Sequence, residues 1–171
     1  MTQTYAVPAG WMPRSASRKP LALLNAVAFA KESARPLDQW TYFFGSYGIR
    51  AVAAARKRNG WPHRQGVGIG ISGLTLRLPE GEDDVPWHDV TAIRATYAAP
   101  ADPKLANYPV LQIDYNGTSV DVPTMILAAA PVVVFCALQF YWQNPAHRDE
   151  LGSVEAQKRM AAWLPAVRPS A

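Results

Sequence analysis

The stretch that decides the fold runs from Val67 to Val122 and opens with VGIGISGLTLRL, residues 67–78. Apolar residues alternate with small or polar ones on both sides of Ser72-Gly73. Successive side chains of a strand point to opposite faces, so an alternation of period two indicates a half-buried strand. Two such runs around a two-residue turn predict a β-hairpin.

The same residues contain a glycine pattern that nucleotide-binding proteins also use. Gly68 to Gly73 match G-x-G-x-x-G letter for letter. A dinucleotide site needs these glycines between a strand and a helix whose N-terminus holds the pyrophosphate. Here LTLRL, residues 74–78, follows and has the pattern of a strand. We therefore expect a glycine-rich hairpin and no bound cofactor.

Further strands are expected downstream of this hairpin. Residues 79–84, PEGEDD, predict an acidic loop, and residues 90–97 predict the next strand. Residues 110–115 and 118–122 flank Asn116-Gly117, the dipeptide preferred in type I′ turns. These two runs predict a second hairpin.

The C-terminal third predicts helices. An apolar helix is expected from Pro131 to about Gln143, because proline is tolerated at the first helical position. Residues 125–142 carry no charge and reach the lower limit for a membrane span, but Pro131 and Gln139 interrupt them, so a buried helix is favoured. Ser153 predicts the cap of a last helix from Val154 to about Leu164.

The N-terminal third has a different character. Residues 1–20 lack periodicity and predict a flexible arm, and residues 21–62 predict a helical extension. Within the extension, one helix is expected over residues 21–31 and a second over residues 39–58. Glycines leave a strand or a break near residues 41–49 open.

Charge is distributed unevenly along the chain. Residues 1–65 carry ten Lys and Arg against two acidic residues, whereas residues 66–125 carry three against eight. The two halves can attract each other, or the basic half can form a surface for anionic lipid or nucleic acid. The candidate interaction residues on the basic half are Arg56, Lys57, Arg58 and Arg64.

The residue types that carry enzyme chemistry do not form a recognised pattern. The histidines have no i, i+4 pair suited to zinc, and His88 and Asp89 are expected on opposite faces of a strand. The acidic triplet Glu82-Asp83-Asp84 is expected to be a solvated loop. We expect no catalytic, cofactor or metal site.

The single cysteine, Cys136, lies in an apolar run and predicts a buried thiol. One cysteine excludes an intrachain disulfide and fits a reducing cytoplasm. The apolar run over residues 21–30 is short and contains Asn25, so we do not expect a signal peptide there. The expected location is cytoplasmic, with the inner face of the membrane as the alternative.

The phrase VPWHDV at residues 85–90, ahead of the strand that begins at Val90, resembles a phrase of bacterial pleckstrin-homology-like (PH-like) proteins of actinobacterial or actinobacteriophage type. The phrase YWQNPAHRDEL at residues 141–151 is similar to the one after the final helix of that family. The resemblance covers residues 66–151 and leaves residues 152–171 as a C-terminal helix and tail. It implies an α+β fold, a curved antiparallel sheet or partial barrel plugged by a C-terminal helix.

The family fold has seven strands, whereas the patterns above give about five, so one or two more are expected from residues 41–52 or from missed breaks. Trp87 is expected to be a structural anchor of the core. The resemblance implies a non-enzymatic binding or scaffolding module that acts through protein partners or self-association. A membrane-associated protein and a nucleic-acid-binding regulator using residues 1–65 remain the alternatives.

Overall fold

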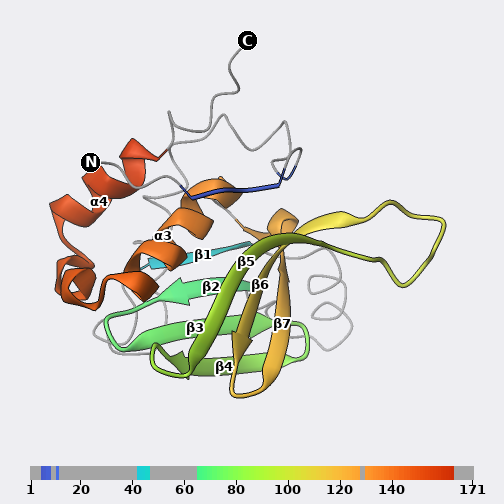
Figure 1. Ribbon diagram of the computed structural model, residues 1–171, viewed down its shortest axis with the longest axis horizontal. Helices are drawn as coiled ribbons and strands as arrows, with labels where there is room; N and C mark the ends of the chain where they lie inside the picture. Colours follow the sequence, from blue (N-terminus) through green and yellow to red (C-terminus); the bar gives the residue numbers. More distant parts are fainter. Residues whose placement is uncertain (1–4, 9–10, 12–41, 47–64, 128–129, 164–171) are drawn as a thin grey trace, which may run out of the picture.

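The computed structural model describes residues 5–8, 11, 42–46, 65–127 and 130–163 of the 171-residue chain, and Figure 1 shows its arrangement. The fold is α+β, with two antiparallel sheets followed by helices. The first sheet has the order β1 (Tyr42–Ser46), β2 (Gln65–Ile69), β3 (Gly73–Leu78) and β4 (Gly81–Pro86). The second has the order β5 (Val90–Ala98), β6 (Tyr108–Tyr115) and β7 (Thr118–Pro123).

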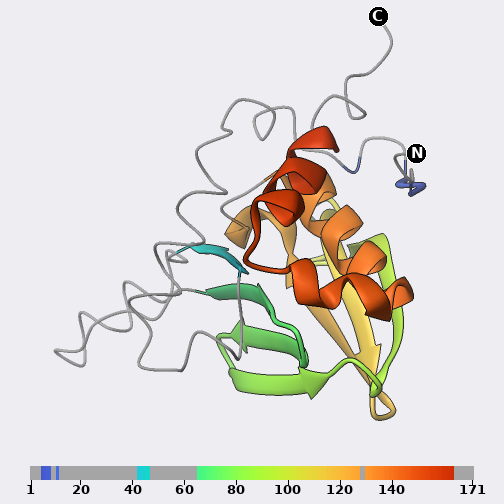
Figure 2. The same ribbon diagram turned by 90° about the vertical axis from the view of Figure 1, so that its left-hand side faces the viewer.

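Among the described residues, four helical segments follow β7: η2 (Thr124–Ile126), α3 (Pro131–Gln143), η3 (Pro145–Glu150) and α4 (Val154–Ala162). Figure 2 shows α3 against the space between the two sheets, with α4 on the outer side of α3. Apolar side chains from both sheets and from α3 form one core. The arrangement is compatible with a partial barrel.

The hairpin predicted from the glycine-rich stretch is confirmed as β2 and β3, with Val67 opposite Leu76. Gly73 is required by the approach of the next strand. A Cβ at this position would lie 2.3 Å from the carbonyl oxygen of Val85 and 2.9 Å from Cα of Pro86. The glycine therefore serves close strand packing, and the interpretation of the motif as a hairpin is confirmed.

The acidic loop predicted over residues 79–84 is wrong for most of its length, because β4 occupies Gly81–Pro86. Two of the acidic side chains of β4 have polar partners on β3. Asp84 lies opposite Thr75, whose hydroxyl donates to its carboxylate at 2.7 Å. Arg77 lies opposite Glu82 and forms an ion pair with it. Cross-strand pairs of this kind stabilise a strand whose own composition favours a loop.

The second predicted hairpin is confirmed as β6 and β7. Asn116 has φ 48° and Gly117 has φ 74°, so both turn residues adopt the left-handed conformation that a type I′ turn requires. Asn116 also donates its side-chain amide to Asp89 at 3.1 Å, which holds this turn against the connection between the two sheets.

Trp87 lies in that connection, and its expected burial is confirmed. The side chain is 3% exposed, and its indole N–H donates to the carbonyl oxygen of Gly70 at 2.9 Å. The guanidinium of Arg148 lies 4.8 Å from the ring centroid. Trp87 thus joins the β2–β3 turn, the link between the sheets and the C-terminal segment.

The expectation that His88 and Asp89 point apart is wrong. Residues 87–89 form a turn, and the two side chains meet at 3.2 Å between His88 Nε2 and an Asp89 oxygen. The side chain of His88 is 83% exposed, so the pair lies at the surface and lacks the enclosure of a catalytic dyad.

Helix α3 has the predicted bounds and is buried on nearly all sides. It also covers the free edge of β5. Gln139 donates its side-chain amide to the carbonyl oxygen of Ile93, and Trp142 donates its indole N–H to that of Val90 at 3.1 Å. Among the helices of the described residues, none has the length and apolar content that crossing a membrane requires.

The predictions for the N-terminal third are corrected in part. Of the alternatives left open for residues 41–49, the strand is confirmed, because Tyr42–Ser46 form β1 in place of a helix. The rest of the helix predicted over residues 39–58 lies outside the described residues. The helix over residues 21–31 lies outside them entirely. Of the arm predicted over residues 1–20, the structure describes residues 5–8 and 11. Trp11 is fully buried and donates to the carbonyl oxygens of Thr96 (2.9 Å) and Val110 (3.1 Å).

Candidate interaction surface

The residues predicted from the sequence to carry function do not come together in the described structure. Arg56, Lys57, Arg58 and Arg64 lie outside the described residues. Trp87 belongs to the core. In residues 5–8, 11, 42–46, 65–127 and 130–163, no group of three or more His, Cys, Asp or Glu side chains is placed to hold a metal ion.

The buried thiol predicted at Cys136 is confirmed. The residue is 4% exposed on α3, and burial raises the pKa of its thiol to about 11. Only the thiolate is a nucleophile, so a thiol with this pKa stays protonated and unreactive at neutral pH.

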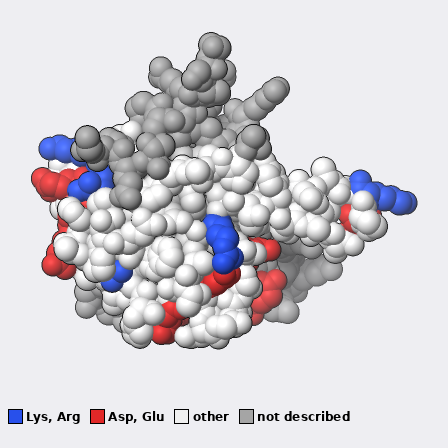
Figure 3. Space-filling view, in the orientation of Figure 1, with Lys and Arg blue, Asp and Glu red and all other residues white. Residues whose placement is uncertain are grey.

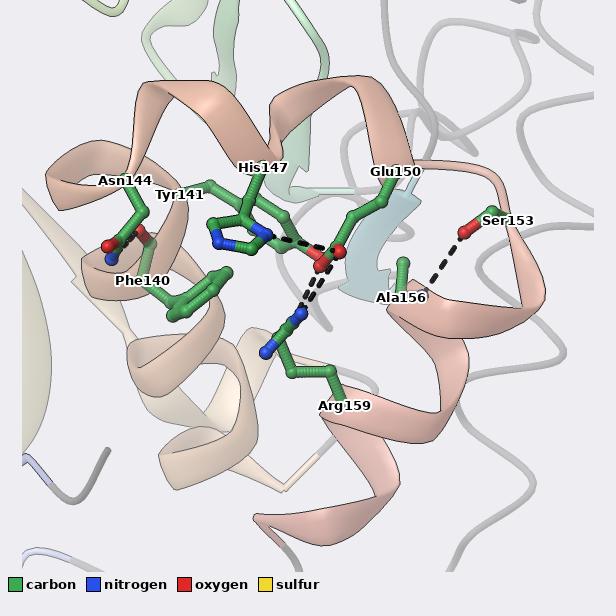
Figure 4. A network of polar contacts seen from close by, with 8 residues as sticks. All are labelled: Phe140, Tyr141, Asn144, His147, Glu150, Ser153, Ala156 and Arg159. Atoms are coloured by element: carbon green, nitrogen blue, oxygen red, sulfur yellow. Dashed lines mark hydrogen bonds and ion pairs between the residues drawn. The ribbon is translucent and has the colours of Figure 1, made fainter. Parts of the chain in front are cut away.

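A polar cluster lies at the C-terminal end of the fold and is shown in Figure 4. Glu150 accepts two hydrogen bonds from Arg159, at 2.6 and 3.0 Å, and one from the Tyr141 hydroxyl at 3.1 Å. His147 lies 3.4 Å from the same carboxylate. The hydrogen bonds from Arg159 hold the pKa of Glu150 below its usual value, although burial acts in the opposite direction.

The geometry of this cluster fits a structural clasp. The guanidinium of Arg159 lies 4.4 Å from the ring centroid of Phe140, so both its charge and its flat face are in contact. Ser153 accepts from the main-chain N–H of Ala156 at 3.3 Å and caps α4 as predicted. The cluster ties α3, η3 and α4 together.

The described residues form a half-open hollow of about 410 Å³ elsewhere, between the turn end of the β3–β4 hairpin and β7. We call it the β4–β7 hollow. Its lining residues are Leu76, Leu78, Glu80, Gly81, Asp83, Ser119, Val120 and Asp121.

The floor and the rim of the β4–β7 hollow differ in chemistry. Leu76 is 2% exposed, and Leu78 and Val120 are partly buried, so the floor is apolar. Glu80, Asp83 and Asp121 are exposed around it and form the rim. Figure 3 shows acidic groups gathered over β7 and the neighbouring hairpin end. The hollow is therefore suited to a group that combines apolar surface with positive charge.

Two rim carboxylates are held in place from β6. The Tyr115 hydroxyl donates to Asp83 at 2.8 Å, and the Gln112 amide donates to Asp121 at 3.2 Å. Burial, together with the hydrogen bond to Asp83, raises the pKa of Tyr115 to about 12, so this donor keeps its proton at neutral pH. A rim oriented in this way needs less reorganisation when it meets a cation.

The free edge of β7 adds main-chain hydrogen-bonding groups. Tyr115 and Thr118 flank a two-residue turn and pair with each other. In an antiparallel ladder, bonded and non-bonded pairs alternate from such a turn. The main-chain groups of Ser119 and Asp121 therefore point away from β6, towards the hollow.

This edge contrasts with the free edge of β5, where the carbonyl oxygens of Ile93 and Val90 accept from Gln139 and Trp142. Exposed edges are places where another chain can add hydrogen bonds. In the described part of the fold, the edge beside the hollow is the one that combines such groups with an apolar floor.

A second exposed feature is the connection between β5 and β6. Figure 1 shows this hairpin projecting far from the body of the protein. We call residues 98–108 the arm from here on; it is distinct from the N-terminal segment of residues 1–20. Every residue from Ala101 to Asn107 is exposed, including Leu105 at 62%. An apolar side chain held this far from the core is a candidate contact with another molecule.

The sequence signals for this surface were incomplete. The acidic run is visible in the sequence but predicts a loop, so it does not indicate an edge strand. The alternation around Val120 indicated the strand but not the approach of the β3–β4 hairpin to it. The arm has a weak signal: Pro100 and Pro103 precede an isolated leucine, Leu105, in a segment of otherwise polar and small residues.

Comparisons with protein-family models, with curated protein sequences and with solved structures found no significant match to this chain.

Proposed function

We propose that this chain is a non-enzymatic PH-like binding module of the cytoplasm that acts through protein partners or self-association. The observation that carries the proposal is the β4–β7 hollow, an apolar floor ringed by acidic side chains beside an exposed strand edge. The group that fits it best is a protein segment carrying a Lys or Arg next to an apolar residue.

The element order supports the PH-like part of the proposal. A four-stranded sheet, a three-stranded sheet and a helix over the space between them follow each other along the chain. Strands β1 and β4 bring the number of strands to the seven that the family resemblance requires. The phrase VPWHDV lies at the crossing between the two sheets, where Trp87 fills the core.

The charge of the described surface favours a cationic peptide over the two alternatives from the sequence. Anionic lipid and nucleic acid both need a positive surface. The rim of the hollow carries three carboxylates, and the basic residues 56–58 and 64 lie outside the described structure. A protein partner is thus the hypothesis that the described residues support.

Fluorescence anisotropy of a labelled peptide of alternating Lys and Leu tests this proposal. We expect the wild-type protein to bind it with an affinity that falls as salt rises, because charges at the rim are screened. Val120→Arg, which fills the floor and adds a positive charge, should weaken binding at least about tenfold, the equivalent of 1.4 kcal/mol.

Glu155→Gln is the matched control, since it removes an exposed carboxylate on α4, far from the hollow. It should bind as the wild type does. Equal binding by Val120→Arg and wild type would contradict the proposal. Binding to phosphatidylserine vesicles or duplex DNA, with no binding to the peptide, would favour the alternatives instead.

A further inference from the structure

The tip of the arm is an ordered turn that presents two neighbouring side chains. Asp102 accepts from the main-chain N–H of Lys104 through its carboxylate, at 3.0 Å, and from that of Leu105 through its carbonyl oxygen, at 3.1 Å. Pro103 occupies the second position of this turn, where its fixed φ is favourable. The turn therefore holds Lys104 and Leu105 in a defined position before any contact forms.

The chemistry of the tip matches that of the β4–β7 hollow. The tip carries an apolar side chain, Leu105, beside a cation, Lys104, and both are exposed. The hollow has an apolar floor at Leu78 and Val120 and carboxylates at its rim. Its volume of about 410 Å³ falls within the range of roughly 300–1,000 Å³ over which pockets enclose small ligands.

The tip of one chain cannot fill the hollow of the same chain. Figure 1 shows the arm continuing the direction of β5 and β6 away from the body, whereas the hollow lies against the body between β7 and the β3–β4 hairpin. Figure 3 shows a positive and a negative group at the far end of the arm, well separated from the acidic groups on the body. The matching tip must come from another molecule.

We propose that the occupant is a second copy of this chain, which inserts Lys104 and Leu105 into the β4–β7 hollow of its neighbour. This inference rests on the proposed function, because it uses the hollow as a binding site. The two contacting surfaces are different, so each copy can give an arm and receive one. Such a contact either closes when two copies exchange arms reciprocally about a two-fold axis or continues head to tail into rings or open chains.

The preorganised tip and the oriented rim both favour this contact. Asp102 fixes the turn on one side, and Tyr115 and Gln112 hold Asp83 and Asp121 on the other. Neither surface has to be ordered on binding, which lowers the entropic cost of association. The main-chain groups of Ser119 and Asp121 supply further hydrogen bonds at the edge.

Sedimentation velocity on the full chain, with two variants that disable opposite ends of the contact, tests the inference. The arm variant carries Lys104→Glu and Leu105→Asp, and the hollow variant carries Val120→Arg. Wild-type protein should form species of two or more copies that grow with concentration. Each variant alone should sediment as a monomer.

The decisive sample is an equal mixture of the two variants. The arm variant still has an intact hollow, and the hollow variant still has an intact arm, so one contact can form between them. The mixture should give dimers and no larger species. An interface that does not use the arm and the hollow would not produce this pattern, because the two variants would then have no complementary intact surfaces.

Controls on α4 match the arm changes in chemistry. Lys158→Glu reverses an exposed charge, and Val154→Asp replaces an apolar side chain that is 58% exposed. The two together should self-associate as the wild type does. Far-UV circular dichroism checks that every variant keeps the wild-type fold, which is expected for the arm variant because its changed residues are exposed.

Monomeric wild type, variants that self-associate as well as wild type, or a mixture that stays monomeric would each overturn the inference. The proposed function can be separated from it. If the Lys–Leu peptide binds in the hollow while the wild type stays monomeric, the self-association is wrong and the binding function stands. If the peptide also fails to bind, both are wrong.

Discussion

Trp87 gives the sharpest prediction about what holds the two sheets together. Replacing it by Ala removes a side chain that is 3% exposed, together with its hydrogen bond to Gly70 and its contact with Arg148. Truncation of a buried large aromatic costs about 3–5 kcal/mol. Domains are stable by only about 5–15 kcal/mol, so this one change should remove a large part of the total.

Trp87→Phe separates packing from hydrogen bonding. The ring stays in the core, but the Gly70 carbonyl loses its donor, which costs about 1–3 kcal/mol when the acceptor is buried. We therefore expect the loss to rise from Phe to Ala. Urea unfolding followed by far-UV circular dichroism measures both losses without relying on fluorescence, which five other tryptophans share.

A loss of unfolding free energy below about 1 kcal/mol for Trp87→Ala would refute this reasoning, because truncation of a buried aromatic side chain of this size destabilises a protein by more than that. Equal losses for Phe and Ala would show that the hydrogen bond, and not the packing, carries the stabilisation.

Three further predictions concern other contacts. The Arg159 hydrogen bonds lower the pKa of Glu150 in the folded protein, so their contribution to stability is present above pH 4.5 and is lost as the pH falls through the lower, folded pKa. In urea titrations, Glu150→Gln should therefore destabilise the protein at pH 7 by about 1–2 kcal/mol, and the loss should shrink as the pH is lowered below 4.5. Gln139→Leu should cost about 1–3 kcal/mol in the same assay, because it leaves a main-chain carbonyl of the β5 edge without its donor, and an unchanged midpoint would contradict that role. Gly73→Ala should lower the melting temperature because its Cβ would meet β4 main chain, whereas Gly81→Ala, where nothing lies within 4 Å, should melt as wild type; similar melts for both would show that β4 can shift away.

The parts of the fold that could be predicted from the sequence have local causes. The type I′ turn at Asn116-Gly117 depends on two residues that tolerate positive φ, and both adopt it. The helix from Pro131 to Gln143 depends on a proline at its start and an apolar run that only Gln139 interrupts before its end, and its bounds agree with the prediction. The Ser153 cap depends on one side chain and its own helix. Signals of this kind do not require knowledge of distant partners.

The errors arose where a distant partner overrides local preference. Strand β4 has a loop-like composition and is stabilised by Thr75 and Arg77 on the neighbouring strand. Trp11 lies in an aperiodic segment, yet it is buried because carbonyl oxygens of β5 and β6 accept its N–H. The His88–Asp89 contact required knowledge of a turn that forms only because the chain crosses between the sheets.

The candidate surface was less predictable than the fold. The β4–β7 hollow combines the end of one hairpin with the edge of another, about 40 residues apart in sequence. Hydrophobic periodicity indicates single helices and strands, so it does not indicate that these two segments lie close together. The acidic composition of residues 80–84 was visible, but its pairing with the apolar floor at Val120 is a property of the folded chain.

Cross-linking across the proposed contact tests the central claim most directly. Leu105→Cys in one copy and Ser119→Cys in another place a thiol on the arm tip and one in the hollow, while Cys136 remains protected by burial and by its raised pKa. Mixing the two proteins under mild oxidation should give a disulfide-linked dimer of one of each, faster than Leu105→Cys mixed with Val154→Cys on α4. Equal rates for the two mixtures, or no heterodimer, would contradict the insertion of the arm into the hollow.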